Sequence, residues 1–195
     1  DRALDLVERG HIEKGKATIL ELLKEHPGNH TAHFGLGVVH AKKKQYDEAI
    51  ACFDKATEIF PYYAPAYFNK GVAYKEKLEP TNAVKAFQKA ATLGDPQEDF
   101  VRQANDFITS LEKSLLETNG IDLDTYLEGE KIFNDAFSCL QKREWGKALD
   151  GFRRCLEKNK KHVQSYGNMG ICYAQLGRKR EALQALDKAL EIDPN

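Results

Sequence analysis

The chain has 195 residues, of which 42% are hydrophobic and 30% are charged, and this composition supports a folded core and excludes wholesale disorder. The 29 basic and 30 acidic residues give a formal net charge of −1, so the overall charge predicts neither nucleic-acid binding nor membrane binding. No run of about 18 apolar residues occurs, and no transmembrane helix is therefore predicted.

An internal repeat organises most of the chain. When the sequence is shifted against itself by one repeat length, similar residues align within the N-terminal part and, at the same shift, within the C-terminal part. The spacing between the equivalent residues Ala83 and Ala148 of the two parts is longer than one repeat length. Such a period is typical of repeat architectures built from one recurring supersecondary unit. The aligned pairs are Phe34 and Phe68, Gly37 and Gly71, Ala49 and Ala83, Phe53 and Phe87, Asn134 and Asn168, and Ala148 and Ala182.

Residues 1–97 form the first predicted array. Residues 1–29 are expected to be a partial repeat with a shortened first helix. Repeats 30–63 and 64–97 follow, each with two stretches of apolar residues at helical spacing. In repeat 30–63 these stretches predict helices over 30–41 and 46–60, with a polar turn between them and Pro61 after the second.

Residues 98–128 break the period. Apolar residues at helical spacing predict one long amphipathic helix over 97–117, and Gly120 follows as a stop signal. Asp122 or Asp124 can cap the helix that comes next. The segment is either an in-line connector, equivalent to a degenerate repeat, or a wedge that splits the array. The in-line connector is favoured because the length of the segment is close to one period.

The C-terminal part contains the repeats 129–162 and 163–195, the first of which departs more from the common pattern. No stretch alternates between apolar and polar residues with a period of two, so no strand is expected. Because one helix pair cannot bury both of its faces, successive pairs must stack. The sequence therefore predicts an all-α, right-handed solenoid of about five helix pairs with one irregular connector.

The recurring residues resemble a known family. The pattern of an aromatic residue, Leu-Gly, Tyr, then Ala-x3-Phe and Pro within one period is similar to the tetratricopeptide repeat. The chain offers Tyr67-x2-Lys70-Gly71-x2-Tyr74 with Ala83-x3-Phe87, and Tyr166-x2-Met169-Gly170-x2-Tyr173 with Ala182-x3-Leu186. The resemblance implies a non-catalytic protein–protein interaction module or scaffold. Members of the family bind a peptide or helix in a groove lined by the first helix of each pair.

Carrying the groove positions of the family onto this chain gives an apolar stripe with recurring amides. Aromatic residues supply contact area, and amides can bond to the main chain of a partner. The alternative is that these residues pack against a neighbouring turn, the connector or a second copy of the chain. The candidate groove residues are Phe34, Val38, Phe68, Asn69, Val72, Phe133, Asn134, Phe137, Asn168 and Ile171.

The predicted turns between paired helices carry basic residues, which a solenoid would place along one edge. One explanation is that cations are favourable at helix C-termini. The other is an acidic partner or a nucleic acid, and this gives a second candidate function. The basic-edge residues are Lys43, Lys44, Lys75, Arg143, Arg178 and Arg180.

No pattern of acid, base and nucleophile predicts catalysis, and no cofactor or metal is expected. A phosphate-loop reading of Gly10-x4-Gly15-Lys16 fails because Ala17 stands where the motif needs Ser or Thr. The four cysteines contain no C-x-x-C spacing and are expected to be free thiols, which favours a reducing, cytoplasmic location. The shortened first repeat, together with an end at a repeat boundary, also leads us to expect a slice of a larger array.

Overall fold

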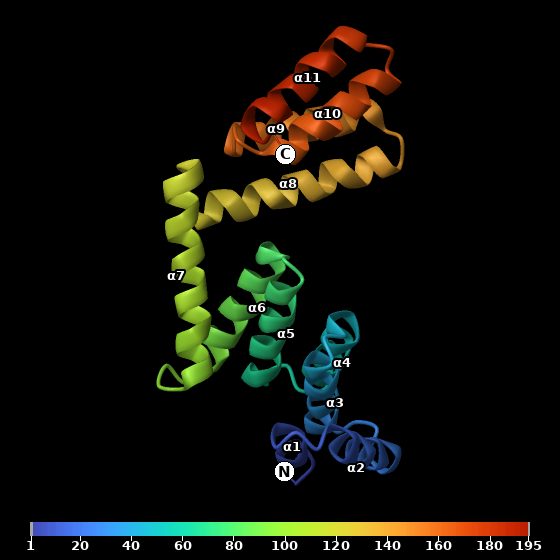
Figure 1. Cartoon of the computed structure of the whole chain (residues 1–195), viewed down its shortest axis with the longest axis vertical. Helices are drawn as coiled ribbons and strands as arrows, with labels where there is room; N and C mark the ends of the chain where they lie inside the picture. Colours follow the sequence, from blue (N-terminus) through green and yellow to red (C-terminus); the bar gives the residue numbers. More distant parts are fainter. Residues whose placement is uncertain (1, 195) are drawn as a thin grey trace. The chain divides into compact units, whose positions relative to one another are not determined.

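The computed structural model of the chain describes residues 2–194, and these form eleven helices and no strand (Figure 1). The predicted all-α class is confirmed, because the helices follow one another as stacked pairs. The contacts divide the chain into two compact units, Asp1–Thr109 and Ser110–Asn195. None of the described helices combines the length and the apolar character that a bilayer span requires.

The first unit contains three helix pairs and the beginning of a long helix. The members of a pair lie side by side, and the first helix of each pair packs on the second helix of the pair before it. The helices are α1 (Arg2–Glu8), α2 (Ile12–Glu25), α3 (His30–Lys42), α4 (Tyr46–Ile59), α5 (Ala64–Glu76), α6 (Pro80–Leu93) and the first half of α7 (Asp99–Asn119). The helix α1 has 7 residues.

Small and large residues alternate where paired helices meet. In the pair α3 and α4, Ala49 and Phe53 are fully buried, and Gly37 on the facing helix lies against the Phe53 ring. In the pair α5 and α6, Phe87 packs in the same way on Gly71. The small residue lets the helix axes approach, and the aromatic ring fills the remaining space.

The turn within each repeat has one recurring backbone geometry. The second residue after the first helix adopts a left-handed conformation, with φ of 59° at Lys44, 58° at Leu78, 60° at Arg143 and 74° at Gly177. The next residue donates its backbone N–H to a carbonyl five residues earlier, as Glu79 does to Tyr74 at 3.0 Å. This arrangement satisfies the last carbonyls of the helix and reverses the chain.

The long helix α7 ends in the second unit, which also contains two helix pairs. Its observed start, at Asp99, is two residues later than the predicted start at position 97. The backbone N–H of Gln97 bonds to the Asp95 carboxylate at 2.8 Å, and this turn delays the helix. The remaining helices are α8 (Leu123–Gln141), α9 (Trp145–Lys158), α10 (Val163–Gln175) and α11 (Lys179–Ile192).

The end of α7 and the start of α8 follow the predicted stop and cap signals. Gly120 has a φ of 70° and directly follows the last residue of α7. Of the two candidate caps, Asp122 takes the role, because its carboxylate accepts the Thr125 N–H at 2.8 Å. Asp124 lies inside the first turn of α8 instead.

Candidate functional site

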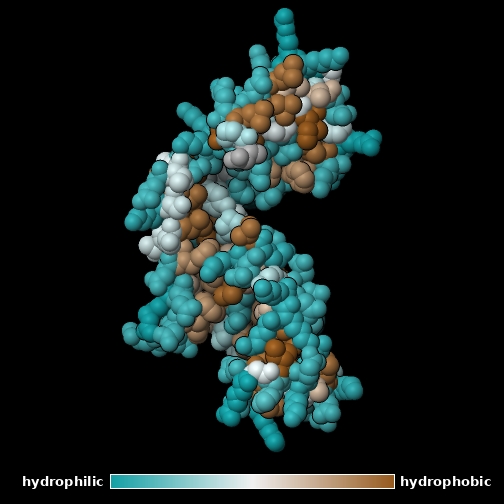
Figure 2. All heavy atoms as spheres, in the orientation of Figure 1, coloured by the Kyte–Doolittle hydropathy of each residue, from teal (hydrophilic) through white to brown (hydrophobic). Residues whose placement is uncertain are grey.

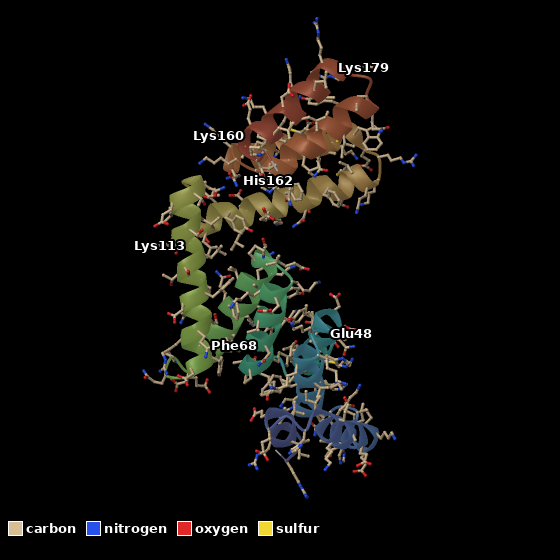
Figure 3. The ribbon with its side chains drawn as sticks, in the orientation of Figure 1. Glu48, Phe68, Lys113, Lys160, His162 and Lys179 are labelled. Atoms are coloured by element: carbon tan, nitrogen blue, oxygen red, sulfur yellow. The ribbon has the colours of Figure 1, made fainter. Side chains whose placement is uncertain are left out.

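The candidate groove residues of the first unit contact other parts of that unit. Phe34 is 9% exposed and packs on Phe53 and Tyr63, with ring centroids 5.8 and 5.2 Å apart. Phe68 lies between α6 and α7, with its centroid 5.6 Å from both Phe87 and Phe100 (Figure 3). The aromatic side chains of α3 and α5 are therefore largely used for packing within the unit.

The remaining candidates of this unit are also engaged. Val38 and Val72 are half-buried and pack against the apolar clusters around Phe53 and Phe87. The Asn69 side-chain amide donates to the Pro65 carbonyl, one turn earlier, at 2.9 Å. The Asn69 side-chain NH₂ group therefore already donates one hydrogen bond within α5.

The candidates of the second unit are more open. Phe133 and Phe137 stack on α8 with centroids 6.0 Å apart. Phe137 is 38% exposed, and Ile171, which holds the equivalent position on α10, is 47% exposed. The structure therefore leaves apolar surface accessible at matching positions on these two helices.

Two amides accompany this apolar surface. Asn134 is exposed and Asn168 is half-buried, and they occupy equivalent positions on α8 and α10. Within residues 2–194 neither side chain has a hydrogen-bond partner, so donors and acceptors of both remain available. Gly167 precedes Asn168, and a side chain added to Gly167 would meet no atom within 4 Å. We call the surface formed by Phe133, Asn134, Phe137, Gly167, Asn168 and Ile171 the α8–α10 face.

A buried polar cluster adjoins Phe133. The imidazole of His162, at the start of α10, lies 4.8 Å from the Phe133 ring, between α8 and α10 (Figure 3). Its Nε2 is 3.1 Å from Glu130 Oε1, and its Nδ1 is 2.8 Å from the Ser165 hydroxyl. The His162 and Glu130 side chains are only 10% and 19% exposed. This cluster fixes the start of α10 against α8.

The protonation of His162 depends on two opposing effects. Burial lowers the pKa of the imidazole, but hydrogen bonds and charge interactions with Cys155 and Glu130 outweigh it and raise the pKa to about 9. The charged ring donates from both nitrogens, to Glu130 and to the Ser165 hydroxyl. The neutral ring can instead accept the Ser165 N–H, which is 3.2 Å from Nδ1, and cap α10.

Four of the predicted basic-edge residues lie in the turns, namely Lys43, Lys44, Arg143 and Arg178, whereas Lys75 lies in the last turn of α5 and Arg180 in the first turn of α11. Several basic groups in and near these turns are paired with acids. Lys43 Nζ is 2.6 Å from Glu13 Oε1, and this hydrogen bond lowers the pKa of the Glu13 carboxyl. Lys77, two residues after the candidate Lys75, bonds to Asp47 at 2.7 Å. Each of these pairs joins the turn of one repeat to the second helix of the repeat before it.

The other basic-edge residues fall into two groups. Arg178 bonds to Glu181 at 2.8 Å and lies 4.8 Å from the centroid of the Tyr173 ring. Lys44, Arg143 and Arg180 are exposed, as is Lys75. The pairing lowers the positive field that a nucleic acid would meet along this edge.

Family comparisons match the helical repeats directly. Three tetratricopeptide repeat models match the chain, over residues 1–64, 64–93 and 163–195. The chain is a tetratricopeptide repeat protein. The repeat 129–162, which departs more from the common pattern, lies outside these matches, although α8 and α9 form the same kind of helix pair.

Two curated proteins are similar to this chain over part of their length. Superkiller protein 3 of Schizosaccharomyces pombe is 26% identical over 177 residues, which are 83% of this chain and 12% of that protein. Photosystem I assembly protein Ycf3 of Prochlorococcus marinus is 35% identical over 102 residues, which are 50% of this chain and 54% of that protein. The chain thus spans about half the length of the Ycf3 protein and a much smaller part of Superkiller protein 3.

Solved structures share the fold. The TPR2AB domain of yeast Sti1 in its complex with pHSP90 has a TM-score of 0.51 at 17% identity, covering 98% of this chain and 75% of that chain. The P58(IPK) TPR domain has a TM-score of 0.52 at 14% identity, covering 98% and 49%. At these identities the likeness concerns the arrangement of the helices.

Sequence reasoning missed His162 as a member of the site. Its partner Glu130 is 32 residues earlier, and only the side-by-side packing of two tetratricopeptide first helices brings them together. The available signal was a polar residue directly before a predicted helix, a position that favours capping. The four cysteines are free thiols in the structure, with Cys155 and Cys172 buried, and the described residues contain no group of three potential metal ligands.

Proposed function

We propose that this tetratricopeptide repeat protein is a non-catalytic scaffold whose α8–α10 face captures a peptide or a helix of another protein. The observation that carries the proposal is that Phe137 and Ile171 stay exposed at equivalent positions, with unpaired amides at Asn134 and Asn168 beside them. The equivalent side chains of the first unit, Val38 and Val72, are half-buried and pack against the apolar clusters of that unit.

The chemistry of the face favours an apolar anchor on the ligand. An apolar side chain of the ligand can cover Phe137 and Ile171, and burying one such residue is worth about 1.5–3 kcal/mol. Asn134 and Asn168 can each donate to and accept from the ligand main chain. A ligand held mainly through a carboxylate is disfavoured, because the positions of the face itself hold no Lys or Arg.

The polar cluster next to the face supports a structural role for its residues. Ser165, His162 and Glu130 form a chain of hydrogen bonds, as in a hydrolase triad. However, Ser165 is 0% exposed, so its hydroxyl cannot reach a substrate. We therefore assign these residues to holding α10 in place.

The proposal is tested with peptides selected from a random library on the purified full chain. Changing Phe137 and Ile171 together to Ser should weaken the selected peptides by about 10- to 100-fold, because two exposed apolar contacts are lost. The matched control changes Leu20 and Leu78 to Ser; these residues of the first unit are 40% and 87% exposed. The control should bind like the original chain.

A second pair of variants tests the face by blocking it. Gly167→Arg should abolish peptide binding without loss of stability, since the added side chain meets open space. Gly146→Arg is the control, because Gly146 lies on α9 and also has no atom within 4 Å of an added side chain. Unchanged peptide affinity in both the Phe137–Ile171 and Gly167 variants would show that the ligand binds elsewhere.

A further inference from the structure

Two turns of the second unit carry five exposed basic residues. The turn after α8 holds Lys142 and Arg143, and the turn after α10 leads into Arg178, Lys179 and Arg180. Because α8 and α10 are consecutive first helices, both turns lie at one edge of the unit (Figure 1), and hydrophilic side chains project from this edge (Figure 2). Figure 3 places Lys179 there, at the start of α11. We call these five residues the basic turn cluster.

The carboxylates within these turns are already engaged. Glu181 bonds to Arg178 at 2.8 Å, and Glu144 bonds to Lys147, which lies outside the cluster, at 2.9 Å. Four side chains of the cluster have no hydrogen bond and no ion pair within residues 2–194, namely those of Lys142, Arg143, Lys179 and Arg180. The cluster therefore keeps an excess of positive charge at the surface.

The first unit neutralises its turn lysines with acids that the second unit lacks. The turn lysines of the first unit bond to the second residue of α2 or of α4, which is Glu13 or Asp47. The same position holds Gly146 in α9 and Arg180 in α11. In the second unit the acid is thus absent from one helix and replaced by a base in the other.

Helix stability does not explain the charges at the start of α11. Cations are favourable near the C-terminal end of a helix, where Lys142 lies. Lys179 and Arg180 are instead the first two residues of α11, at the positive end of the helix dipole. The start of α4 carries Asp47 and Glu48, which are favourable at that position. A bound carboxylate would offset the repulsion at the start of α11.

We propose that the basic turn cluster binds an acidic peptide segment of another protein through the carboxylates of its Asp or Glu side chains. An arginine can hold a carboxylate with two parallel hydrogen bonds, and three of the five residues are arginines. The cluster lies outside the α8–α10 face, so this proposal does not rest on peptide capture by that face.

An acidic peptide fits this surface better than a nucleic acid does. Bases need an open aromatic ring for stacking. The ring of Tyr173 is only 7% exposed, and the Arg178 guanidinium lies 4.8 Å from its centroid. Asp122 and Asp124 lie at the other end of α8, about 27 Å from the cluster, and would repel a nucleic-acid strand that followed the helix.

The test measures the binding of a labelled peptide of alternating Glu and Gly to the purified full chain by fluorescence anisotropy. A peptide of alternating Gln and Gly is the control ligand. The Glu peptide should bind at least about tenfold more tightly, because only this peptide carries carboxylates. Its affinity should fall as salt is added. Equal affinities of the two peptides would overturn the proposal.

A charge reversal tests the residues at the start of α11. Changing Lys179 and Arg180 to Glu should weaken the Glu peptide by at least about tenfold, because two attractions become repulsions. The melting temperature should not fall, since acids are favourable at the start of a helix. The control changes Lys85 and Lys89 of α6, both exposed, to Glu and alters the net charge equally. Equal losses in both variants would refute the cluster.

A second variant tests whether the two turns form one surface. Changing Lys142 and Arg143 to Gln should weaken the Glu peptide by about three- to tenfold, because one of the two turns loses its charge. Changing Phe137 and Ile171 to Ser should leave the affinity for this peptide unchanged. Unchanged binding in the Lys142–Arg143 variant, or lost binding in the Phe137–Ile171 variant, would contradict a separate surface built from both turns.

A competition experiment tests the other class of ligand. Unlabelled Glu peptide should displace the labelled peptide at a lower concentration than a single-stranded RNA of the same charge. If the RNA is the stronger competitor, the surface is a nucleic-acid site and the proposed acidic peptide is wrong.

Discussion

A side-chain carbon placed on Gly71 would lie 2.7 Å from the Phe87 ring, so the two helices of this pair approach as closely as a hydrogen side chain permits. The preceding pair repeats the relationship, where a side-chain carbon on Gly37 would lie 2.5 Å from the ring of Phe53. Gly167, also within a first helix, meets nothing within 4 Å. Glycine thus allows close packing of paired helices at Gly37 and Gly71, whereas Gly167 lies at an open surface.

This difference predicts opposite effects of the same substitution. Gly71→Ala should lower the free energy of unfolding by about 1–3 kcal/mol, because the added methyl group overpacks the pair against Phe87. Gly167→Ala should raise it by about 0.5–1 kcal/mol, because alanine favours a helix over glycine where space is free. Urea unfolding of the full chain measures both. Effects of the same sign would contradict the packing described for these positions.

The left-handed turn position predicts a stabilising substitution. Leu78 has a φ of 58° and is 87% exposed, so it contributes little packing while its backbone is strained. Leu78→Gly should therefore raise the free energy of unfolding by about 1 kcal/mol. Gly177 occupies the equivalent turn, and Gly177→Leu should lower stability by a similar amount. Thermal unfolding checks both changes, and a stabilising Gly177→Leu would contradict the strain argument.

The fold could be predicted because the residues that pack each helix pair recur once in every repeat. The positions of Gly71, Phe87 and Ala83 recur along the chain, so each pair specifies the same local packing. The start of α7 shifted from position 97 to Asp99 where a local turn at Asp95 competed, and its end shifted from position 117 to Asn119, next to the stop signal Gly120. Helix existence followed from apolar periodicity, while helix starts depended on side-chain bonds that periodicity does not report.

The candidate site was less predictable, because exposure depends on what covers each helix. Register alone treats Phe68 and Phe133 as equivalent groove positions. Both are half-buried in the structure, but different elements cover them: Phe100 of α7 lies on Phe68, whereas His162 at the start of α10 lies on Phe133. The pairing of His162 with Glu130 likewise requires two helices to be side by side. These contacts belong to tertiary packing and have no signature in the repeat pattern.

The paired basic edge predicts weak binding of nucleic acid. Lys43 and Lys77 bond to Glu13 and Asp47, so a labelled single-stranded RNA should show little binding and little salt dependence. The triple change of Glu13 to Gln, Asp47 to Asn and Glu79 to Gln removes the carboxylate partners of both lysines and should increase binding at low salt. Titrations at two salt concentrations measure this. Steep salt dependence in the original chain would instead support the edge as a nucleic-acid site.

The contact between His162 and Glu130 predicts a pH dependence of stability in the second unit. The pKa of His162 is raised to about 9 in the folded chain, above its ordinary value of 6.5. The stabilisation is therefore fully present below about pH 6.5 and is lost as the pH rises to about 9. We expect a loss of about 1–2 kcal/mol over this range, because solvent screens part of the interaction.

The single tryptophan, Trp145 on α9, reports this unit in urea unfolding of the full chain. Glu130→Gln should reduce the dependence between pH 6.5 and 9, since the charged imidazole keeps its interaction with Cys155 but loses its carboxylate partner. Glu128→Gln is the matched control on the same helix, because Glu128 pairs with Lys158 at 2.8 Å and not with the histidine. If Glu130→Gln and Glu128→Gln give the same pH profile, the dependence arises from another group and the role assigned to His162 is wrong.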